Sequence, residues 1–441
     1  MFTTSSAAFS ARNGIAYGLL GLPLAFVALP LYVILPNYYS REFGVPLITL
    51  GFVLLGARLF DAFIDPLLGR MSDGLFARSA KAVLTMGAAA AVVLAAGFAL
   101  LFFPPVKGPT ALVAWVSLML MITYAAYSAL SVAHQSWGAM LGGNEAERSR
   151  IVAWREGLGL VGVVLASVTP VALGLPLTTV VFFVALGIGW LAWTRAVQPS
   201  TSQATDGQRG RAASVDKQAM WRPFDHRNFK YLLLVFMLNG VASAVPATLV
   251  LFFIQDRLQA PASMEPMFLG SYFLTAALSI PLWLAVVKRM GLAKTWLIGM
   301  LLSIAVFAWA TQVGAGQTTA FLIITSLSGI ALGTDLTLPG ALLAGVIQRN
   351  GESGKSEGAY FGWWNFAIKL NLALAAGLAL PMLGYFGYSP GARDSHALNA
   401  LVIAYCVLPC ALKLAAGASL YFLIVKQPER YKVVHDQSST V

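Results

Sequence analysis

The sequence predicts an all-α membrane protein with twelve transmembrane helices in two pseudo-symmetric six-helix bundles. The 441-residue chain is 58% hydrophobic and only 11% charged, whereas a soluble domain carries about 25% charged residues. Apolar runs of about 18 residues or more, long enough to cross a bilayer, recur along the whole chain. A short basic turn follows the second run at 69–74, and a weaker counterpart follows the eighth run at 288–291. Equivalent turns at equivalent places indicate a duplicated architecture.

The apolar runs define six predicted spans in each half of the chain. The first six are 14–39, 46–70, 82–104, 110–133, 151–173 and 175–196, and the second six are 231–254, 266–287, 293–313, 318–347, 358–386 and 398–424. The segment between the halves is rich in Ser, Thr, Gln and Gly, which is typical of a flexible tether. We therefore predict an N-terminal six-helix bundle at 1–196, a cytoplasmic linker at 197–230, a C-terminal six-helix bundle at 231–425 and a cytoplasmic tail at 426–441.

The distribution of basic residues predicts the orientation of the chain in the membrane. With the N-terminus in the cytoplasm, most of the 29 Lys and Arg residues fall in cytoplasmic loops. Those on the other side are Arg41, Lys107, Arg257 and Arg393. This asymmetry predicts that both termini are cytoplasmic, in what we expect to be a bacterial inner membrane. It also explains the net charge of +11 without nucleic-acid binding. The first thirteen residues lack the pattern of a cleaved signal peptide.

Three ionisable residues lie within the second predicted span. Asp61 and Asp65 are four residues apart, so they share one face of a helix, and Arg58 lies one turn before them. Pro66 follows directly and removes a backbone donor. Charges inside a membrane cost about 2.5–3.5 kcal/mol each on insertion scales, so they usually mark a transport pathway. The alternative is an arginine–aspartate pair that only joins two helices.

Further charged residues lie within other predicted spans. Lys369, in the eleventh span, could neutralise the two acids together with Arg58, and a bound proton or small cation would then loosen this network. Arg155 either contacts substrate or extends to the membrane surface. Asp335 could cap a helix bend, while packing is favoured for Lys413 and a satisfied polar role is favoured for His134.

Three segments resemble the glycoside–pentoside–hexuronide cation symporter family of the major facilitator superfamily. The run Arg58–Gly69 resembles the first signature of that family, and Glu357–Lys369 is similar to its second. Val152–Arg155 resembles the segment that holds the sugar-contacting arginine. The resemblance covers nearly the whole chain. It implies the major facilitator fold and cation-coupled, sugar-symporter-like transport by alternating access.

The chain departs from this family at positions that bear on the ion and the sugar. Ile64 stands where the sodium-using members have an asparagine, and Ala125 and Ser128 replace a threonine and an aspartate. Leu22 and Pro23 replace the lysine and the acid that hold the sugar. Sodium needs several oxygen ligands, whereas a proton needs one carboxylate whose pKa is raised by burial or a like charge. We therefore favour a proton over sodium as the coupling ion.

These observations assign candidate residues to three roles. Coupling of the cation or proton is assigned to Asp61, Asp65, Lys369 and Arg58. Substrate binding is assigned to Arg155, Tyr124, Ser128, Trp363 and Asn365. Gating is assigned to Gly69, Arg70 and Asp73. We expect no catalytic or metal site and no cofactor beyond the coupling H⁺ or Na⁺. The expected partners of the monomer are a small-molecule substrate, the cation and the lipid bilayer.

Two other functions remain open from the sequence. The segment Gly18–Pro23 is somewhat similar to lysophospholipid-carrying relatives, so an amphipathic lipid is an alternative substrate. An intramembrane prenyltransferase would use Asp61, Asp65 and Asp73, but it requires a second Asp-rich cluster that the sequence lacks. ATP-driven transport is not expected, because Gly354–Ser356 lacks the upstream glycine of a phosphate-binding loop.

Overall fold

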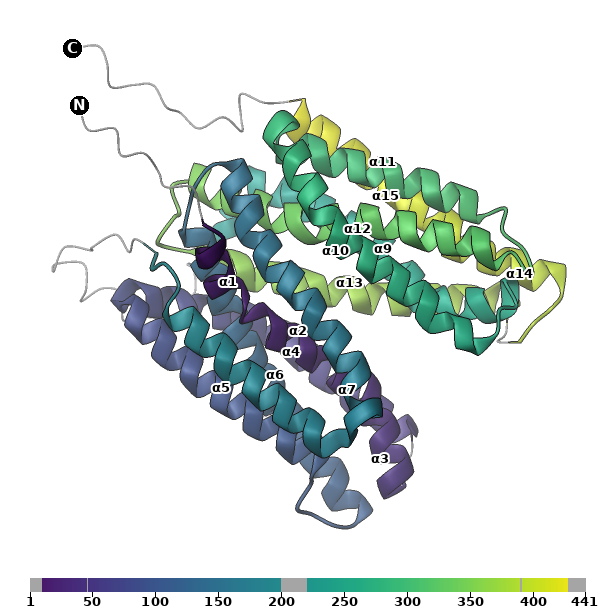
Figure 1. The fold of residues 1–441 in the computed structure, drawn as a ribbon, viewed down its shortest axis with the longest axis horizontal. Coiled ribbons are helices and arrows are strands. Elements are labelled where there is room, and N and C mark those ends of the chain that lie inside the picture. Colours follow the sequence, from purple (N-terminus) through teal and green to yellow (C-terminus); the bar gives the residue numbers. More distant parts are fainter. Residues whose placement is uncertain (1–9, 46, 200–219, 389–390, 427–441) are drawn as a thin grey trace. The chain divides into compact units, whose positions relative to one another are not determined.

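The computed structural model describes residues 10–45, 47–199, 220–388 and 391–426, and helices dominate these ranges (Figure 1). Ten helices in the described ranges are long and apolar enough to cross a membrane. Two further helices, α4 (Leu47–Arg78) and α13 (Glu357–Tyr385), have 32 and 29 residues and occupy the second and eleventh predicted spans. The all-α, twelve-span architecture predicted from the sequence is confirmed.

The remaining helices of the first half follow the predicted spans closely. They are α1 (Ala11–Gly18), α2 (Gly21–Leu29), α3 (Leu35–Phe43), α5 (Ala80–Phe102), α6 (Pro109–Met140) and α7 (Glu145–Thr194). The first span is therefore segmented, and a π-helical turn separates α2 from α3. The fifth and sixth spans join as α7, which kinks at Gly174, where φ is 75°. Glycine adopts this left-handed φ without the clash that a Cβ would cause.

The helices of the second half also match their predicted spans. They are α9 (Arg227–Phe252), α10 (Glu265–Met290), α11 (Leu292–Ala310), α12 (Thr318–Arg349), α14 (Ser395–Val402) and α15 (Leu408–Leu420). The last span consists of α14, a π-helical turn and α15. Gly291, with φ at 78°, makes the tight connection between α10 and α11.

Internal contacts divide the chain into two compact units. The first unit comprises residues 1–225 and 352–366, and the second comprises 226–351 and 367–441. The first ten residues of α13 therefore belong with the first unit. Residues 200–219 of the predicted linker and 427–441 of the predicted tail lie outside the described residues, so the domain assignment stays a prediction.

The predicted turn at 69–74 is helical, which corrects one expectation from the sequence. Helix α4 continues to Arg78, and the chain reverses only at Ser79. Ser79 is extended, and its Oγ accepts a hydrogen bond from the N–H of Ala82 at 3.0 Å. Ser79 thus gives a hydrogen-bond partner to one of the N–H groups that lack a partner at the start of α5. It is also the one residue that connects α4 to α5.

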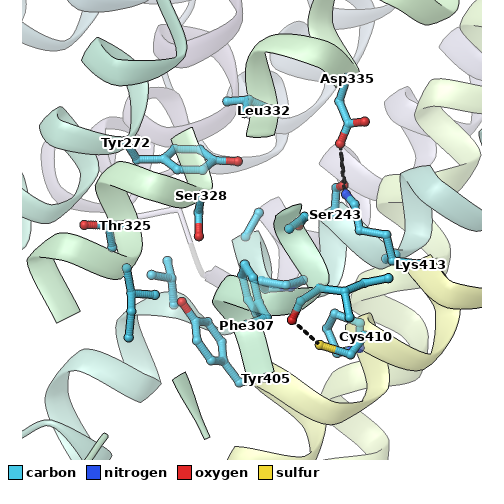
Figure 2. Close-up of a pocket in the computed structure, with 18 of the residues that line it drawn as sticks. Ser243, Tyr272, Phe307, Thr325, Ser328, Leu332, Asp335, Tyr405, Cys410 and Lys413 are labelled. Carbon is cyan, nitrogen blue, oxygen red and sulfur yellow. Dashed lines mark hydrogen bonds and ion pairs between the residues drawn. The ribbon is translucent and has the colours of Figure 1, made fainter. Parts of the chain in front are cut away.

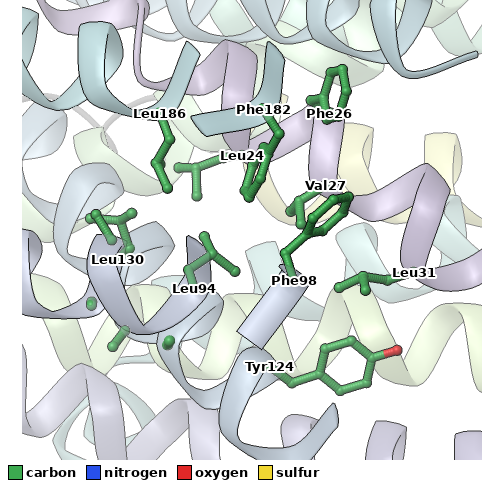
Figure 3. Packing of buried hydrophobic residues seen from close by; sticks show 14 of the residues in the cluster. Leu24, Phe26, Val27, Leu31, Leu94, Phe98, Tyr124, Leu130, Phe182 and Leu186 are labelled. Atoms are coloured by element: carbon green, nitrogen blue, oxygen red, sulfur yellow. The ribbon is translucent and has the colours of Figure 1, made fainter. Parts of the chain in front are cut away.

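Each unit has its own hydrophobic core. In the first unit, Phe98 and Phe26 both pack against Phe182, with ring centroids 4.7 and 5.7 Å apart, among the leucines that Figure 3 shows. In the second unit, Phe253 stacks on Tyr405 with centroids 4.3 Å apart. These cores fix the helices that carry the polar residues described below.

Candidate functional site

The two aspartates of α4 are buried against α6. Asp61 is 1% exposed and Asp65 is fully buried. The hydroxyl of Ser128, on α6, donates a hydrogen bond of 2.7 Å to Oδ1 of Asp61. The structure thus brings together two predicted coupling residues and one predicted substrate residue. Buried carboxylates need such partners, because water is not there to solvate them.

Two tyrosines of α6 extend this group. The hydroxyl of Tyr124, a predicted substrate-binding residue, lies within electrostatic reach of both Arg58 and Asp61. The hydroxyl of Tyr127 lies within electrostatic reach of Asp61 and Asp65. It is also within electrostatic reach of Arg155 and Glu156 on α7. Tyr127 is not among the site residues predicted from the sequence. Its position three residues after Tyr124, on neighbouring turns of one helix, was the available signal.

Arg155, on α7, forms an ion pair with the adjacent Glu156. Its Nε donates to Oε1 of Glu156 at 3.0 Å, and its side chain is 15% exposed. The backbone of this segment packs closely on the first span, because a Cβ on Gly21 would lie 2.6 Å from the carbonyl oxygen of Arg155. An anionic substrate would have to compete with Glu156 for this guanidinium. The substrate role of Arg155 stays a prediction.

The three predicted site residues on α13 do not share one environment. Trp363 and Asn365 belong to the first unit, and Lys369 belongs to the second. The indole N–H of Trp363 donates to the carbonyl oxygen of Met220 at 2.9 Å, and its ring lies 4.7 Å from that of Trp221. Asn365 is buried and only 7% exposed. Lys369 belongs to the second unit, so its pairing with the acids of α4 stays a prediction.

Two of the three predicted gating residues, Gly69 and Asp73, contact the start of α13. A Cβ on Gly69 would lie 2.0 Å from the carbonyl oxygen of Gly358, so the two backbones touch. The carboxylate of Asp73 accepts hydrogen bonds from the N–H groups of Gly358 at 2.6 Å and Ala359 at 3.0 Å. Arg70 lies 4.0 Å from Asp73. Asp73 therefore binds N–H groups of the first turn of α13, which have no partner within their own helix.

Glu357, the first residue of α13, precedes the predicted span 358–386 and is fully buried. Its Oε1 accepts a hydrogen bond of 2.6 Å from the N–H of Gly354. Burial raises the pKa of this carboxyl to about 7, against the opposing effect of backbone hydrogen bonds. The folded protein therefore holds a proton on Glu357 at pH values where the unfolded chain has released it.

This raised pKa predicts a specific dependence of stability on pH. The contribution of Glu357 to the free energy of unfolding is fully present below about pH 4.5. It is lost as the pH rises through about 7, because ionising the buried carboxyl is unfavourable. We expect Glu357→Gln to flatten the fall in melting temperature of the purified protein between pH 5 and pH 8. Glu145→Gln, at the partly exposed first position of α7, should leave that slope unchanged. An equal slope in the Glu357→Gln protein would contradict this prediction.

The second unit holds a further charged pair that the sequence did not connect. Nζ of Lys413, on α15, lies 2.9 Å from Oδ2 of Asp335, on α12. Lys413 also donates to Oγ of Ser243 at 3.0 Å, and Nε1 of Trp296 donates to Oδ1 of Asp335 at 2.8 Å. Asp335 is therefore paired; Lys413 is buried, and Asp335 is partly buried. The available signal was the presence of opposite charges in two predicted spans.

Comparison with known proteins identifies similar sequences over nearly the whole chain. Residues 14–427 match a family model described as MFS/sugar transport protein. An uncharacterised symporter of Bacillus subtilis is 24% identical over 90% of this chain and 88% of its own length. A protein of Salmonella typhimurium, named provisionally as a sulfoquinovose importer, is 24% identical over 97% of this chain and 92% of its own.

Solved structures with low sequence identity share the fold. The Escherichia coli fucose:proton symporter aligns with a TM-score of 0.69 and 16% identity, over 93% of this chain and 99% of its own. A bacterial homologue of the iron transporter ferroportin, in an outward-facing state, aligns with a TM-score of 0.68 and 15% identity over 95% and 99% of the two chains.

Proposed function

Because the chain belongs to the MFS/sugar transport protein family, we propose that it is a secondary active symporter that moves a small organic solute by alternating access. The family consists of transporters, so the protein is a transporter and not a prenyltransferase. The matched relatives carry the names of a symporter and a sulfoquinovose importer, which supports a sugar-like solute. Within the superfamily, the signatures on α4 and α13 favour the glycoside–pentoside–hexuronide branch.

The observation that carries the coupling proposal is the buried aspartate pair on α4. Asp61 accepts a hydrogen bond from Ser128, and both carboxylates are shielded from solvent. Two carboxylates one turn apart on a helix repel each other when both are ionised, so uptake of one proton by the pair would relieve this repulsion. Arg58 and Lys369 are proposed as the positive charges that balance this pair. No side-chain oxygen comes from Ile64, which disfavours sodium.

The contact between α4 and α13 is proposed as part of the gate. Asp73 holds the first turn of α13 through two hydrogen bonds, and Gly69 allows the two backbones to touch. These two bonds, of 2.6 and 3.0 Å, can break and reform during a transport cycle. We further propose that the protein acts as a monomer in a bacterial inner membrane, with both termini in the cytoplasm.

The proposed function is tested by uptake into proteoliposomes with imposed gradients. The probes are L-fucose, D-glucose, D-glucuronate and lysophosphatidylcholine, each offered with a proton gradient and with sodium present or replaced by choline. We expect accumulation of at least one of the three sugar probes that responds to the proton gradient and not to sodium. Strict dependence on sodium would overturn the choice of ion, and transport of the lysophospholipid alone would overturn the choice of solute.

A further inference from the structure

The second unit encloses a cavity of about 220 Å³ between α9, α10, α11, α12 and α15 (Figure 2). Every residue that lines it belongs to the second unit. Drug-sized ligands occupy pockets of about 300–1,000 Å³, so this cavity suits a smaller solute. None of the candidate residues assigned from the sequence lines this cavity.

One wall of the cavity carries the Asp335–Lys413 ion pair. Trp296 fixes one oxygen of Asp335, and Ser243 fixes the ammonium of Lys413, so both charges are held in place. The pair is neutral as a whole. A ligand with a net charge would have to separate the two groups and leave one of them without its counter-ion, which is unfavourable in a buried site. A neutral hydroxyl can donate to the carboxylate or accept from the ammonium while the pair stays intact.

A buried hydroxyl on α12 supplies a second, independent indication of a polar ligand. Among the described residues, Oγ of Ser328 has no hydrogen-bond partner, although the residue is only 6% exposed. Ser328 lines the cavity, and Figure 2 shows its hydroxyl directed into the space that the labelled residues surround. Buried polar groups are normally satisfied, so a ligand hydroxyl at this position would complete the site.

Aromatic rings form much of the remaining wall. Tyr272, Phe307 and Tyr405 all line the cavity, and the rings of Phe307 and Tyr405 lie 5.8 Å apart. Such rings can pack against the apolar C–H face of a small ring-shaped solute. The hydroxyls at the edge of the solute would then face the wall that carries Asp335 and Lys413. The cavity therefore combines an apolar face with a neutral donor–acceptor pair.

We propose that this cavity binds a neutral, hydroxylated solute of monosaccharide size. Asp335 accepts from one ligand hydroxyl, Lys413 donates to a neighbouring one, and Ser328, two turns before Asp335 on the same face of α12, bonds a third hydroxyl. This inference rests on the proposed transport of a sugar-like solute. Beyond that proposed transport, it assigns a binding site to the second unit, and it assigns to this site a preference for an uncharged ligand.

The test measures binding by isothermal titration to the purified full chain, without any gradient. The probes are D-glucose, L-fucose and the anionic D-glucuronate. We expect at least one neutral sugar to bind, and D-glucuronate to bind at least tenfold more weakly than D-glucose. Absence of binding by both neutral sugars, or tighter binding of D-glucuronate than of either, would overturn the proposal.

Variants then assign the binding to the cavity. The double variant Asp335→Leu/Lys413→Met removes both charges together, so neither remains buried alone, and should weaken binding at least tenfold. Ser328→Ala should weaken binding of the sugar at least threefold. If the double variant does not fold, the Ser328→Ala variant tests whether the sugar binds in the cavity. Asp256→Asn, which alters a buried aspartate of the same unit outside the cavity, is the matched control and should bind as the unaltered chain does. Unchanged affinity in the folded double variant would overturn the proposal.

The two proposals fail in different ways. Gradient-driven uptake of a sugar by the double variant at the normal rate and affinity would overturn the cavity assignment and leave the proposed symport standing. Binding that depends on the cavity, without accumulation under any gradient, would support the cavity assignment and overturn the symport.

Discussion

Asparagine in place of Asp61 or Asp65 is expected to abolish concentrative uptake and to leave exchange of substrate across the membrane intact. The amide has nearly the same shape as the carboxylate and can still accept a hydrogen bond from Ser128, which lies 2.7 Å from Asp61. It cannot take up a proton and so cannot couple the solute to the gradient. One charge that crosses a membrane potential of 100 mV supplies about 2.3 kcal/mol. At that potential, loss of coupling should lower the ratio of internal to external substrate about 50-fold.

The measurement compares counterflow of labelled substrate with gradient-driven uptake in the same proteoliposomes. Asp256→Asn is a suitable control, since this aspartate is also buried but lies in the second unit beside Tyr388. It should retain both activities if it folds. Accumulation by the Asp61→Asn and Asp65→Asn proteins at the level of the unaltered chain would refute the assignment, as would the loss of exchange together with uptake.

Alanine at Gly69 is expected to destabilise the protein strongly, although alanine is normally favoured over glycine in a helix. The added Cβ would lie 2.0 Å from the carbonyl oxygen of Gly358, which is backbone and cannot rotate away. Moving α4 and α13 apart would also lengthen the hydrogen bonds from Gly358 and Ala359 to Asp73. Overpacking of this kind costs about 1–3 kcal/mol or more, which exceeds the roughly 1 kcal/mol gained in helix propensity.

Gly74 provides the matched control for this substitution. It lies on the same helix, and a Cβ built there meets no atom within 4 Å. Gly74→Ala should therefore keep or slightly raise the melting temperature of the purified protein, while Gly69→Ala lowers it and reduces uptake. Equal melting temperatures for the two variants would show that the contact between α4 and α13 is not tight.

The amino-acid sequence by itself determined the local features of this protein. Apolar runs placed the helices, because hydrophobicity and length decide whether a segment can cross a membrane, although α4 and α6 continue to Arg78 and Met140, beyond their predicted ends at 70 and 133. The spacing of Asp61 and Asp65 placed both on one helix face, because helical periodicity depends only on neighbours in the chain. The break between the fifth and sixth spans fell at Gly174, the residue with a left-handed backbone.

Only the tertiary structure decided which helix faces meet. It joined Ser128 to Asp61, and it placed the N–H of Gly358 on Asp73, 285 residues away in the chain. It also paired Asp335 with Lys413, which the sequence treated as separate residues. Such contacts depend on how side chains of distant helices pack, and inside a bilayer hydrophobicity does not distinguish one packed face from another. Hydropathy therefore predicted the spans, while partners for the buried charges became visible only in the folded chain.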